Sequence, residues 1–330
     1  MKDRILILGN GFDLDLGLKT SYRDFCNSKY WPFNKLQYDY ERGGYSIPMS
    51  LSDALLLEKN NNTWFDIEAT LGKYACYKRR DDSGYVHPDT VEQANIDKTQ
   101  YESLVSNLKA YLQDIQKKTQ INKDSVAAQV FRAIIRNGYF NKIFTFNYTD
   151  LNFLARNMGV QQDFWYAHMH GTLEKGIILG IESRMDFDPL YRFMCKEYNP
   201  NYETRLLIRS LNEAQEVVFF GHSLSAIDYH YFMSFFKKQS EDILSKEQSK
   251  EITIFTYDIE SQFDICDQLR NMNDRKLDSL FGNNILRLFR TSDCQDTSQY
   301  NEFLNHLRKT SKDAAVSYTH LRAHETDSYL

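Results

Sequence analysis

The sequence lacks long hydrophobic runs and any excess of basic charge. No apolar stretch approaches the roughly 20 residues that a helix needs to cross a bilayer, and no signal-peptide pattern precedes the first apolar run. We therefore expect a cytoplasmic protein that binds no membrane. The net charge is -5 and the pI is about 5.9, so we expect no general attraction to nucleic acid.

Cysteines are few and dispersed: the chain of 330 residues contains five, and no two of them form a C-x-x-C pair. This pattern excludes a zinc module of four cysteines and makes a disulfide framework unexpected. Carboxylates are not clustered in a metal-binding pattern either, so we predict no metal site and no nuclease. With 42% hydrophobic and 26% charged residues, the composition is typical of soluble globular proteins, and the length suits one large domain or two small ones.

The stretch from Arg4 to Phe25 contains the first clear structural pattern. Ile5–Leu8 is an uncharged apolar run, typical of a strand that is buried on both faces. Gly9-Asn10-Gly11 follows at once, which indicates a tight turn or the close approach of a ligand to the backbone. A strand, a glycine turn and a helix in this order form a phosphate-binding geometry.

The spacing of this turn leaves two interpretations open. The dinucleotide fingerprint G-x-G-x-x-G needs a third glycine where Leu14 stands. The carboxylate of Asp13 would also repel a phosphate, unless it meets a ribose hydroxyl instead. By spacing alone, a nucleotide site and a plain strand-to-helix turn explain the pattern equally well.

Apolar runs typical of buried strands alternate with helical patterns through the rest of the chain. The alternation predicts about seven strands with helical crossovers, which is a doubly wound α/β fold with a mainly parallel, Rossmann-like sheet. The later runs occupy residues 143–146, 164–169, 177–181, 217–220, 252–257 and 285–289. In open sheets of this kind, ligands bind beyond the carboxyl ends of the strands. The polar residues at those ends are Asn147, His170, Gly171, Gly221, His222, Ser223 and Asp228.

A mostly helical segment separates the first strand from the next one. Apolar residues at helical spacing predict helices within Trp64–Leu71, Tyr101–Lys117 and Val126–Arg136. The last of these follows a capping Ser125 and ends at Gly138 in the usual manner of a glycine C-cap.

Glu68 lies on the apolar face of the first of these helices. A buried charge needs a partner. Glu68 is therefore either a site residue or the structural partner of a cation or a backbone N–H group.

These patterns divide the chain into three parts. We predict an α/β nucleotide-binding domain formed by residues 1–27 and 138–312, and a mostly helical insertion formed by residues 28–137. The final residues, 313–330, show no periodic face and read like translated adapter sequence. We expect them to be a non-native or disordered tail and exclude their histidines from the site.

Six motifs together resemble a known protein family. GNGFDLDLGLKTSYRDF, WFDIE, FTFNYTD, HGTL, LGI and FGHSLSAIDYHYF occur in this order. They resemble the AbiH family of phage abortive-infection proteins, over about Met1 to Arg290. AbiH proteins are in turn distantly similar to the sirtuin-like group of NAD-binding folds. The resemblance thus implies a sirtuin-like domain with NAD as substrate or ligand.

The resemblance also implies roles for individual residues. Asn147 would approach the nicotinamide ribose, His170 would act as the base, and Asp13 or Asp228 would orient His170 or hold a ribose hydroxyl. The residues implied around the cofactor come from the turns at the strand ends. They are Gly9, Asn10, Gly11, Phe12, Asp13, Gly171, Gly221, His222 and Ser223.

The absence of cysteine pairs argues against protein deacylation as the reaction. Deacylases of the sirtuin-like group carry a zinc module of paired cysteines, which this chain lacks, whereas defence-associated members of the group resemble NAD-cleaving effectors. We therefore expect an anti-phage effector that hydrolyses NAD or a related nucleotide at its N-glycosidic bond.

The alternative is a nucleotide-sensing module without catalysis, which gates a partner or an oligomer in phage defence. A homo-oligomer and a trigger from the phage or from a neighbouring gene would suit either function.

Overall fold

The computed structural model describes residues 3–36, 50–61, 65–78, 88–241 and 248–309. The chain forms two compact units, which we describe separately. Unit 1 consists of residues 1–18, 119–169 and 203–330, and unit 2 consists of residues 19–118 and 170–202.

Unit 1 contains a six-stranded sheet in which every neighbouring pair of strands is parallel. This sheet, flanked by helices, confirms the predicted α/β fold. The strands lie side by side in the order β3 (Tyr166–His168), β2 (Lys142–Thr145), β1 (Asp3–Leu8), β6 (Ala214–Phe220), β7 (Glu251–Thr256) and β8 (Ile285–Arg290). Counted along the chain within this sheet, the order is 3-2-1-4-5-6, which is that of dinucleotide-binding folds. The order reverses between β1 and β6.

The centre of the sheet is enclosed, as the uncharged run predicted. Ile5–Leu8 of β1 are at most 1% exposed. Leu6 pairs with Ile143 on one side and with Val218 on the other. Burial of both faces explains why the segment Ile5–Leu8 is uncharged, whereas the charged residues Asp3 and Arg4 lie at the half-buried start of the strand.

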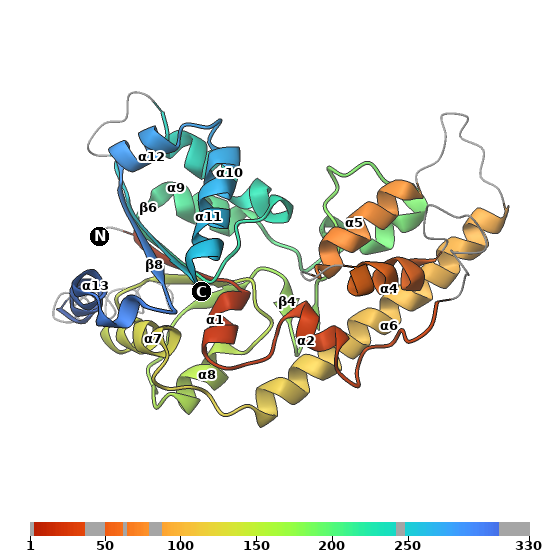
Figure 1. Cartoon of the computed structure of the whole chain (residues 1–330), viewed down its shortest axis with the longest axis horizontal. Helices are drawn as coiled ribbons and strands as arrows, with labels where there is room; N and C mark the ends of the chain where they lie inside the picture. The colour runs from red at the N-terminus through yellow and green to blue at the C-terminus, as the bar shows by residue number, and fades with distance from the viewer. Residues whose placement is uncertain (1–2, 37–49, 62–64, 79–87, 242–247, 310–330) are drawn as a thin grey trace, which may run out of the picture. The chain divides into compact units, whose positions relative to one another are not determined.

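Helices cover both faces of the sheet (Figure 1). One layer contains α9 (Arg205–Glu213), α10 (Tyr229–Gln239), α11 (Ile259–Met272) and α12 (Leu277–Asn283). The other contains α1 (Asn10–Asp15), α7 (Val126–Asn137), α8 (Leu151–Asn157) and α13 (Ser298–Lys309). Two short 3-10 helices, η3 (Ala226–Asp228) and η4 (Cys294–Asp296), complete this unit.

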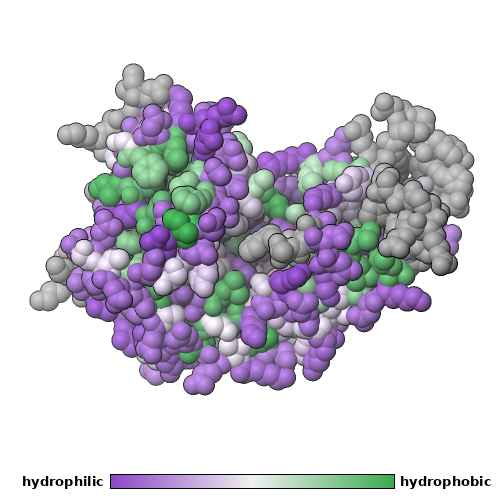
Figure 2. Space-filling model, in the orientation of Figure 1, coloured by the Kyte–Doolittle hydropathy of each residue, from purple (hydrophilic) through white to green (hydrophobic). Residues whose placement is uncertain are grey.

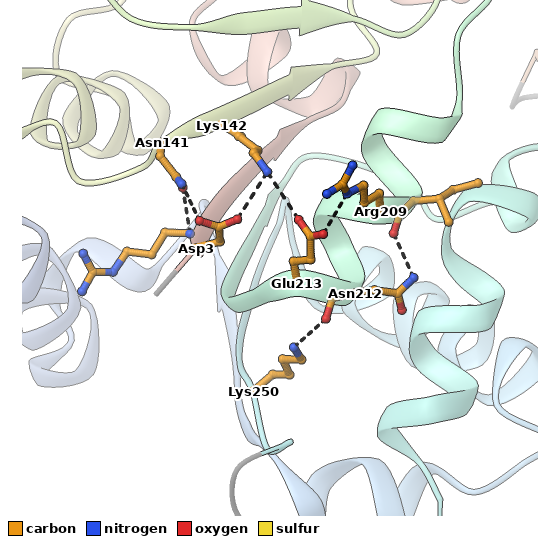
Figure 3. Close-up of polar contacts among 9 residues, drawn as sticks. Asp3, Asn141, Lys142, Arg209, Asn212, Glu213 and Lys250 are labelled. Carbon is orange, nitrogen blue, oxygen red and sulfur yellow. Dashed lines mark hydrogen bonds and ion pairs between the residues drawn. The ribbon is translucent and has the colours of Figure 1, made fainter. Parts of the chain in front are cut away.

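The amino ends of the strands are joined by polar contacts (Figure 3). Lys142 Nζ lies 3.3 Å from Asp3 Oδ2 and 3.9 Å from Glu213 Oε2. Lys250 Nζ donates a hydrogen bond to the carbonyl oxygen of Asn212 at 3.1 Å. These contacts hold the amino edge together, and the carboxyl edge is the one at which ligands bind in sheets of this kind.

The far edge of the sheet carries apolar surface. Figure 2 shows hydrophobic residues gathered on the face over α11, α12 and β8. Phe263, Phe281 and Ile285 are 56%, 44% and 52% exposed, respectively. The edge strand β8 therefore differs from the enclosed β1 and β6.

Unit 2 is mostly helical and is built around a buried carboxylate. Asp97 of α6 accepts hydrogen bonds from the backbone N–H of Leu51 at 3.0 Å, from the Tyr74 hydroxyl at 2.7 Å and from the Tyr191 hydroxyl at 2.9 Å. These bonds connect four helical elements of the unit. Its elements are α2 (Tyr22–Cys26), α4 (Leu51–Asn61), α5 (Ile67–Tyr77), α6 (Pro88–Lys118), η1 (Pro189–Met194), η2 (Lys196–Tyr198) and the antiparallel pair β4 (Gly171–Thr172) and β5 (Gly176–Ile177).

The apolar run at 177–181 does not form the predicted strand of the main sheet. Of this run only Ile177 lies in a strand, β5, which pairs with β4 in unit 2, and Ile181 forms an isolated bridge with Cys195. Gly180 has φ +156°, and a Cβ there would lie 1.9 Å from the carbonyl oxygen of Met194. The run is apolar because it packs inside unit 2 rather than because it joins the parallel sheet.

The boundaries of the two units differ from the predicted domains. α7 belongs to the α/β unit, in which Asp15 Oδ2 accepts the backbone N–H of Ala127 at 2.7 Å. Residues 170–202 belong to the helical unit. The predicted tail, residues 313–330, lies outside the described residues. Within the described part of the chain, no helix is long and apolar enough to span a membrane.

Candidate functional site

The turns that follow β1 and β6 pack directly against each other. Gly9 donates its N–H to Phe220 O at 3.0 Å, and Gly11 donates to Gly221 O at 2.8 Å. A Cβ on Gly9 would lie 2.5 Å from Cα of His222. Gly221 has φ +63°, and a Cβ there would lie 2.4 Å from the carbonyl carbon of Gly11. Contact between the two backbones therefore explains why these positions are glycines.

The backbone N–H groups of the turn after β1 donate to carbonyl oxygens of the chain itself. Phe12 donates its N–H to Gly9 O at 3.0 Å, so the N–H groups of Gly9, Gly11 and Phe12 all bond within the chain. The ring of Phe12 packs edge-on against Phe131 and Phe220, with centroids 5.4 and 5.6 Å away. Asn10 is exposed. The diphosphate role implied for this turn gains no support from these three N–H groups.

Asp13 forms a buried hydrogen-bonded cluster with residues that follow β2. Asn147 Nδ2 donates to Asp13 Oδ1 at 2.8 Å and to the carbonyl oxygen of Gly9 at 2.9 Å. Thr149 Oγ1 donates to Asp13 Oδ2 at 2.7 Å. Burial raises the pKa of Asp13 to about 7, although the bonds from Thr149 and Asn147 oppose the rise. The cluster therefore exchanges a proton near neutral pH.

His168, at the carboxyl end of β3, joins this cluster through the backbone. Its Nδ1 lies 2.8 Å from the carbonyl oxygen of Asn147. Burial lowers its pKa below the ordinary histidine value. The sequence did not single out His168, because this residue lies within the predicted strand 164–169. Its position two residues before His170, at the end of a strand next to β2, was the available signal.

His222 and Asp228 lie beyond β6 in the same unit. His222 Nδ1 accepts the backbone N–H of Leu224 at 3.0 Å, and Nε2 lies 3.7 Å from Asp228 Oδ2. The ring packs against Phe146 at a centroid distance of 4.4 Å, and burial lowers the pKa of His222 to about 3. His222 is therefore a neutral, packed residue, whereas its neighbour Ser223 is exposed.

His170 belongs to unit 2, where its neighbours form an ion pair. Lys196 Nζ lies 2.9 Å from Glu68 Oε1 and 3.4 Å from His170 Nε2. Glu68 Oε1 also accepts the N–H of Gly180 at 3.0 Å. Glu68 therefore contacts both a cation and a backbone N–H group, as expected if its role is structural. Gly171, with φ +78°, begins β4 next to His170.

The predicted site residues belong to both units. Among the described residues, no cluster of histidine, cysteine, aspartate or glutamate side chains could hold a metal ion. Unit 2 contains His170 and Gly171, and unit 1 contains the remaining predicted residues: Gly9, Asn10, Gly11, Phe12, Asp13, Asn147, Gly221, His222, Ser223 and Asp228.

Comparison with known proteins identifies the family. The family model described as "Bacteriophage abortive infection AbiH" matches residues 5–246, which include most of β1, all of β2 to β6 and the described part of unit 2. No curated protein matches the chain. The chain belongs to the AbiH family.

Proposed function

From membership of the AbiH family, which indicates a role in phage abortive infection, we propose that this protein is an effector that binds NAD or a related nucleotide in unit 1 and hydrolyses its N-glycosidic bond. The proposal needs no metal. It places the nucleotide at the carboxyl edge of the six-stranded sheet.

The observation that carries the proposal is the coincidence of the strand-order reversal with a polar cluster. The order reverses between β1 and β6, and ligands of such sheets bind outside the strand ends at this point. Asp13 and Asn147 follow β1 and β2, and Asp228 follows β6. A dinucleotide extends across several strand ends, so one ligand can contact all three.

The proposed reaction needs little covalent help from the protein. Nicotinamide is a good leaving group, so the site has to hold the ribose, exclude water apart from the attacking molecule and stabilise an oxocarbenium-like state. Asn147 would position the ribose or the water. Asp13 is hydrogen-bonded by the neutral groups of Asn147 and Thr149, and it would accept a hydrogen bond from one ribose hydroxyl. Asp228 would accept a hydrogen bond from another ribose hydroxyl.

The role of His170 follows from its contact with Lys196. An ammonium group can only donate hydrogen bonds, so Lys196 directs a hydrogen at Nε2 of His170. His170 would act as a base only after this contact opens. The prediction that His170 is the catalytic base therefore requires a movement of Lys196.

The test is incubation of the purified full chain with NAD, with released nicotinamide as the readout. Wild-type protein should release nicotinamide, and Asn147→Ser should lower the rate at least 100-fold. Asn157→Ser, at an exposed position on α8, is the matched control and should keep full activity.

Binding is measured beside turnover, by the shift in Tm with NAD and with ADP-ribose. A shift without nicotinamide release would favour the sensing module over the hydrolase. If the protein neither released nicotinamide nor showed a shift in Tm, the proposed function would be overturned.

A further inference from the structure

We propose that His168, rather than His170, is the proton acceptor of the reaction in unit 1. This inference rests on the proposed function and adds a residue that no motif indicated. It starts from the position of His168 at the end of β3, in register with Thr145 of β2. His168 is half-buried, so its ring is partly accessible.

The hydrogen bond to Asn147 defines the tautomer of His168. A carbonyl oxygen can only accept, so Nδ1 must carry the hydrogen of the 2.8 Å bond. In the neutral ring Nε2 then carries the lone pair. The ring stays neutral near pH 7 because burial lowers its pKa, opposed by the Asn147 carbonyl and by Asp150.

Other groups near His168 do not occupy Nε2 within the described contacts. Asp150 Oδ1 accepts the Tyr166 hydroxyl at 2.9 Å, and Asp150 Oδ2 lies 3.9 Å from Arg156. The Tyr166 ring lies edge-on to the imidazole, with centroids 5.5 Å apart. An acceptor nitrogen with a fixed tautomer and an oriented ring is the arrangement that a general base requires.

The other two candidate histidines lack this arrangement. Nε2 of His170 faces the ammonium of Lys196, whose side chain is 0% exposed. His222 uses Nδ1 to accept a backbone N–H, which places its hydrogen on Nε2 in the neutral ring, and its ring is packed against Phe146. His168 is therefore the histidine of this group with a lone pair available.

The distance across the sheet is compatible with this role. Neighbouring strands lie about 4.8 Å apart, so β3 lies roughly 10 Å from β1. A dinucleotide that crosses the ends of β6 and β1 reaches this far, with its glycosidic bond over β2 and β3. Asn147 would then contact the ribose with its side chain while its backbone carbonyl holds His168.

The step is balanced without any further reagent. A water molecule gives its oxygen to C1′ of the ribose and one proton to Nε2 of His168. The electron pair of the C1′–N bond leaves with nicotinamide. The resulting imidazolium keeps its Nδ1–H bond to Asn147 and later releases the proton to solvent.

The experiment compares His168→Asn with His170→Asn in the full chain. Asparagine keeps a donor near the position of Nδ1 and removes Nε2, so the bond to Asn147 can persist. We expect kcat for NAD hydrolysis to fall at least 100-fold in His168→Asn with KM changed less than about threefold, because a general base contributes about 10²–10⁴ in rate. His170→Asn should lose less than tenfold.

A pH profile separates catalysis from a structural role. Wild-type kcat/KM should rise with pH through an ionisation below the ordinary histidine pKa, and this limb should disappear in His168→Asn. An active His168→Asn variant beside an inactive His170→Asn variant would overturn the inference while the proposed function stands.

Failure of the proposed function gives a different result, in which wild-type protein releases no nicotinamide. NMR of the imidazole C–H signals then decides the placement of His168. Added ADP-ribose should shift the His168 signal and leave that of His170 unchanged. An unchanged His168 signal in protein that binds ADP-ribose would contradict its place in the site.

Discussion

Each of the two units buries a carboxylate near a histidine, and the surroundings of the two carboxylates differ. In unit 1, Asp13 is hydrogen-bonded by the neutral groups of Asn147 and Thr149, and burial raises its pKa to about 7. In unit 2, Glu68 is paired with the ammonium of Lys196. Burial without a cation disfavours the charged form of Asp13, whereas the ammonium of Lys196 compensates the buried charge of Glu68. The first arrangement suits proton chemistry, and the second suits a fixed structure.

The two histidines repeat this difference. His168 and His170 are two residues apart in the sequence, but they belong to different units. His168 donates to a neutral carbonyl, and His170 faces a buried ammonium. Histidines that look equivalent in a sequence motif therefore have different capacities to accept a proton.

Removal of the cation in unit 2 should have the largest effect on stability. Lys196→Met leaves Glu68 buried without its charged partner, so we expect the free energy of unfolding to fall by about 3–5 kcal/mol. Urea denaturation measures the loss. Lys175→Met, at an exposed position in the same unit, should change stability by less than about 0.5 kcal/mol.

The double variant Glu68→Gln/Lys196→Met tests the cause. It removes both charges, so most of the lost stability should return. A cost below about 1 kcal/mol for Lys196→Met alone would mean that the ion pair contributes little to the stability of unit 2, and the comparison between the units would fail.

Asp13→Asn should change how stability depends on pH. Because the folded protein holds the Asp13 proton up to a pKa of about 7 and the unfolded chain releases it near pH 3.8, wild-type stability should be greatest below that lower value and fall as pH rises to 7. Asp13→Asn lacks this loss. Between pH 5 and 7, urea denaturation should show the two proteins diverging by about 2 kcal/mol in favour of the variant. Parallel pH curves would show that Asp13 does not bind its proton in this way.

Thr149→Val should have the smallest effect, and its cost should grow as pH rises. The hydroxyl of Thr149 donates to Asp13 Oδ2, and this bond favours the ionised carboxylate. The variant removes the bond. We expect a loss of about 1 kcal/mol above pH 7 and less at pH 5, as measured by urea denaturation at both values. Thr99→Val, on the exposed face of α6, should show no dependence on pH. An equal loss at both pH values would assign Thr149 to packing alone.

Local patterns predicted several elements correctly. The uncharged run Ile5–Leu8 is the central strand, Ser125 caps α7, and Gly138 ends α7 in the left-handed conformation. These features depend on neighbours within a few residues, which the sequence displays directly. The run at 177–181 was misjudged because an apolar segment packs equally well in a sheet or under helices.

The sequence by itself determined the α/β class, the family and the chain positions at which polar residues follow strands, since these depend on hydrophobic spacing and on motif order. Only the tertiary structure decided that the Gly9 turn packs against the Gly221 turn and that the hydrogen-bond partners of Asp13 in the described part of the chain are neutral. It also decided that Nδ1 of His168 bonds to the Asn147 carbonyl, whereas Nε2 of His170 faces Lys196. The reason is that hydrogen-bond partners and burial come from residues more than 100 positions away in the chain, such as Asn147 beside Asp13 and Lys196 beside Glu68. Local patterns contain no information about such contacts.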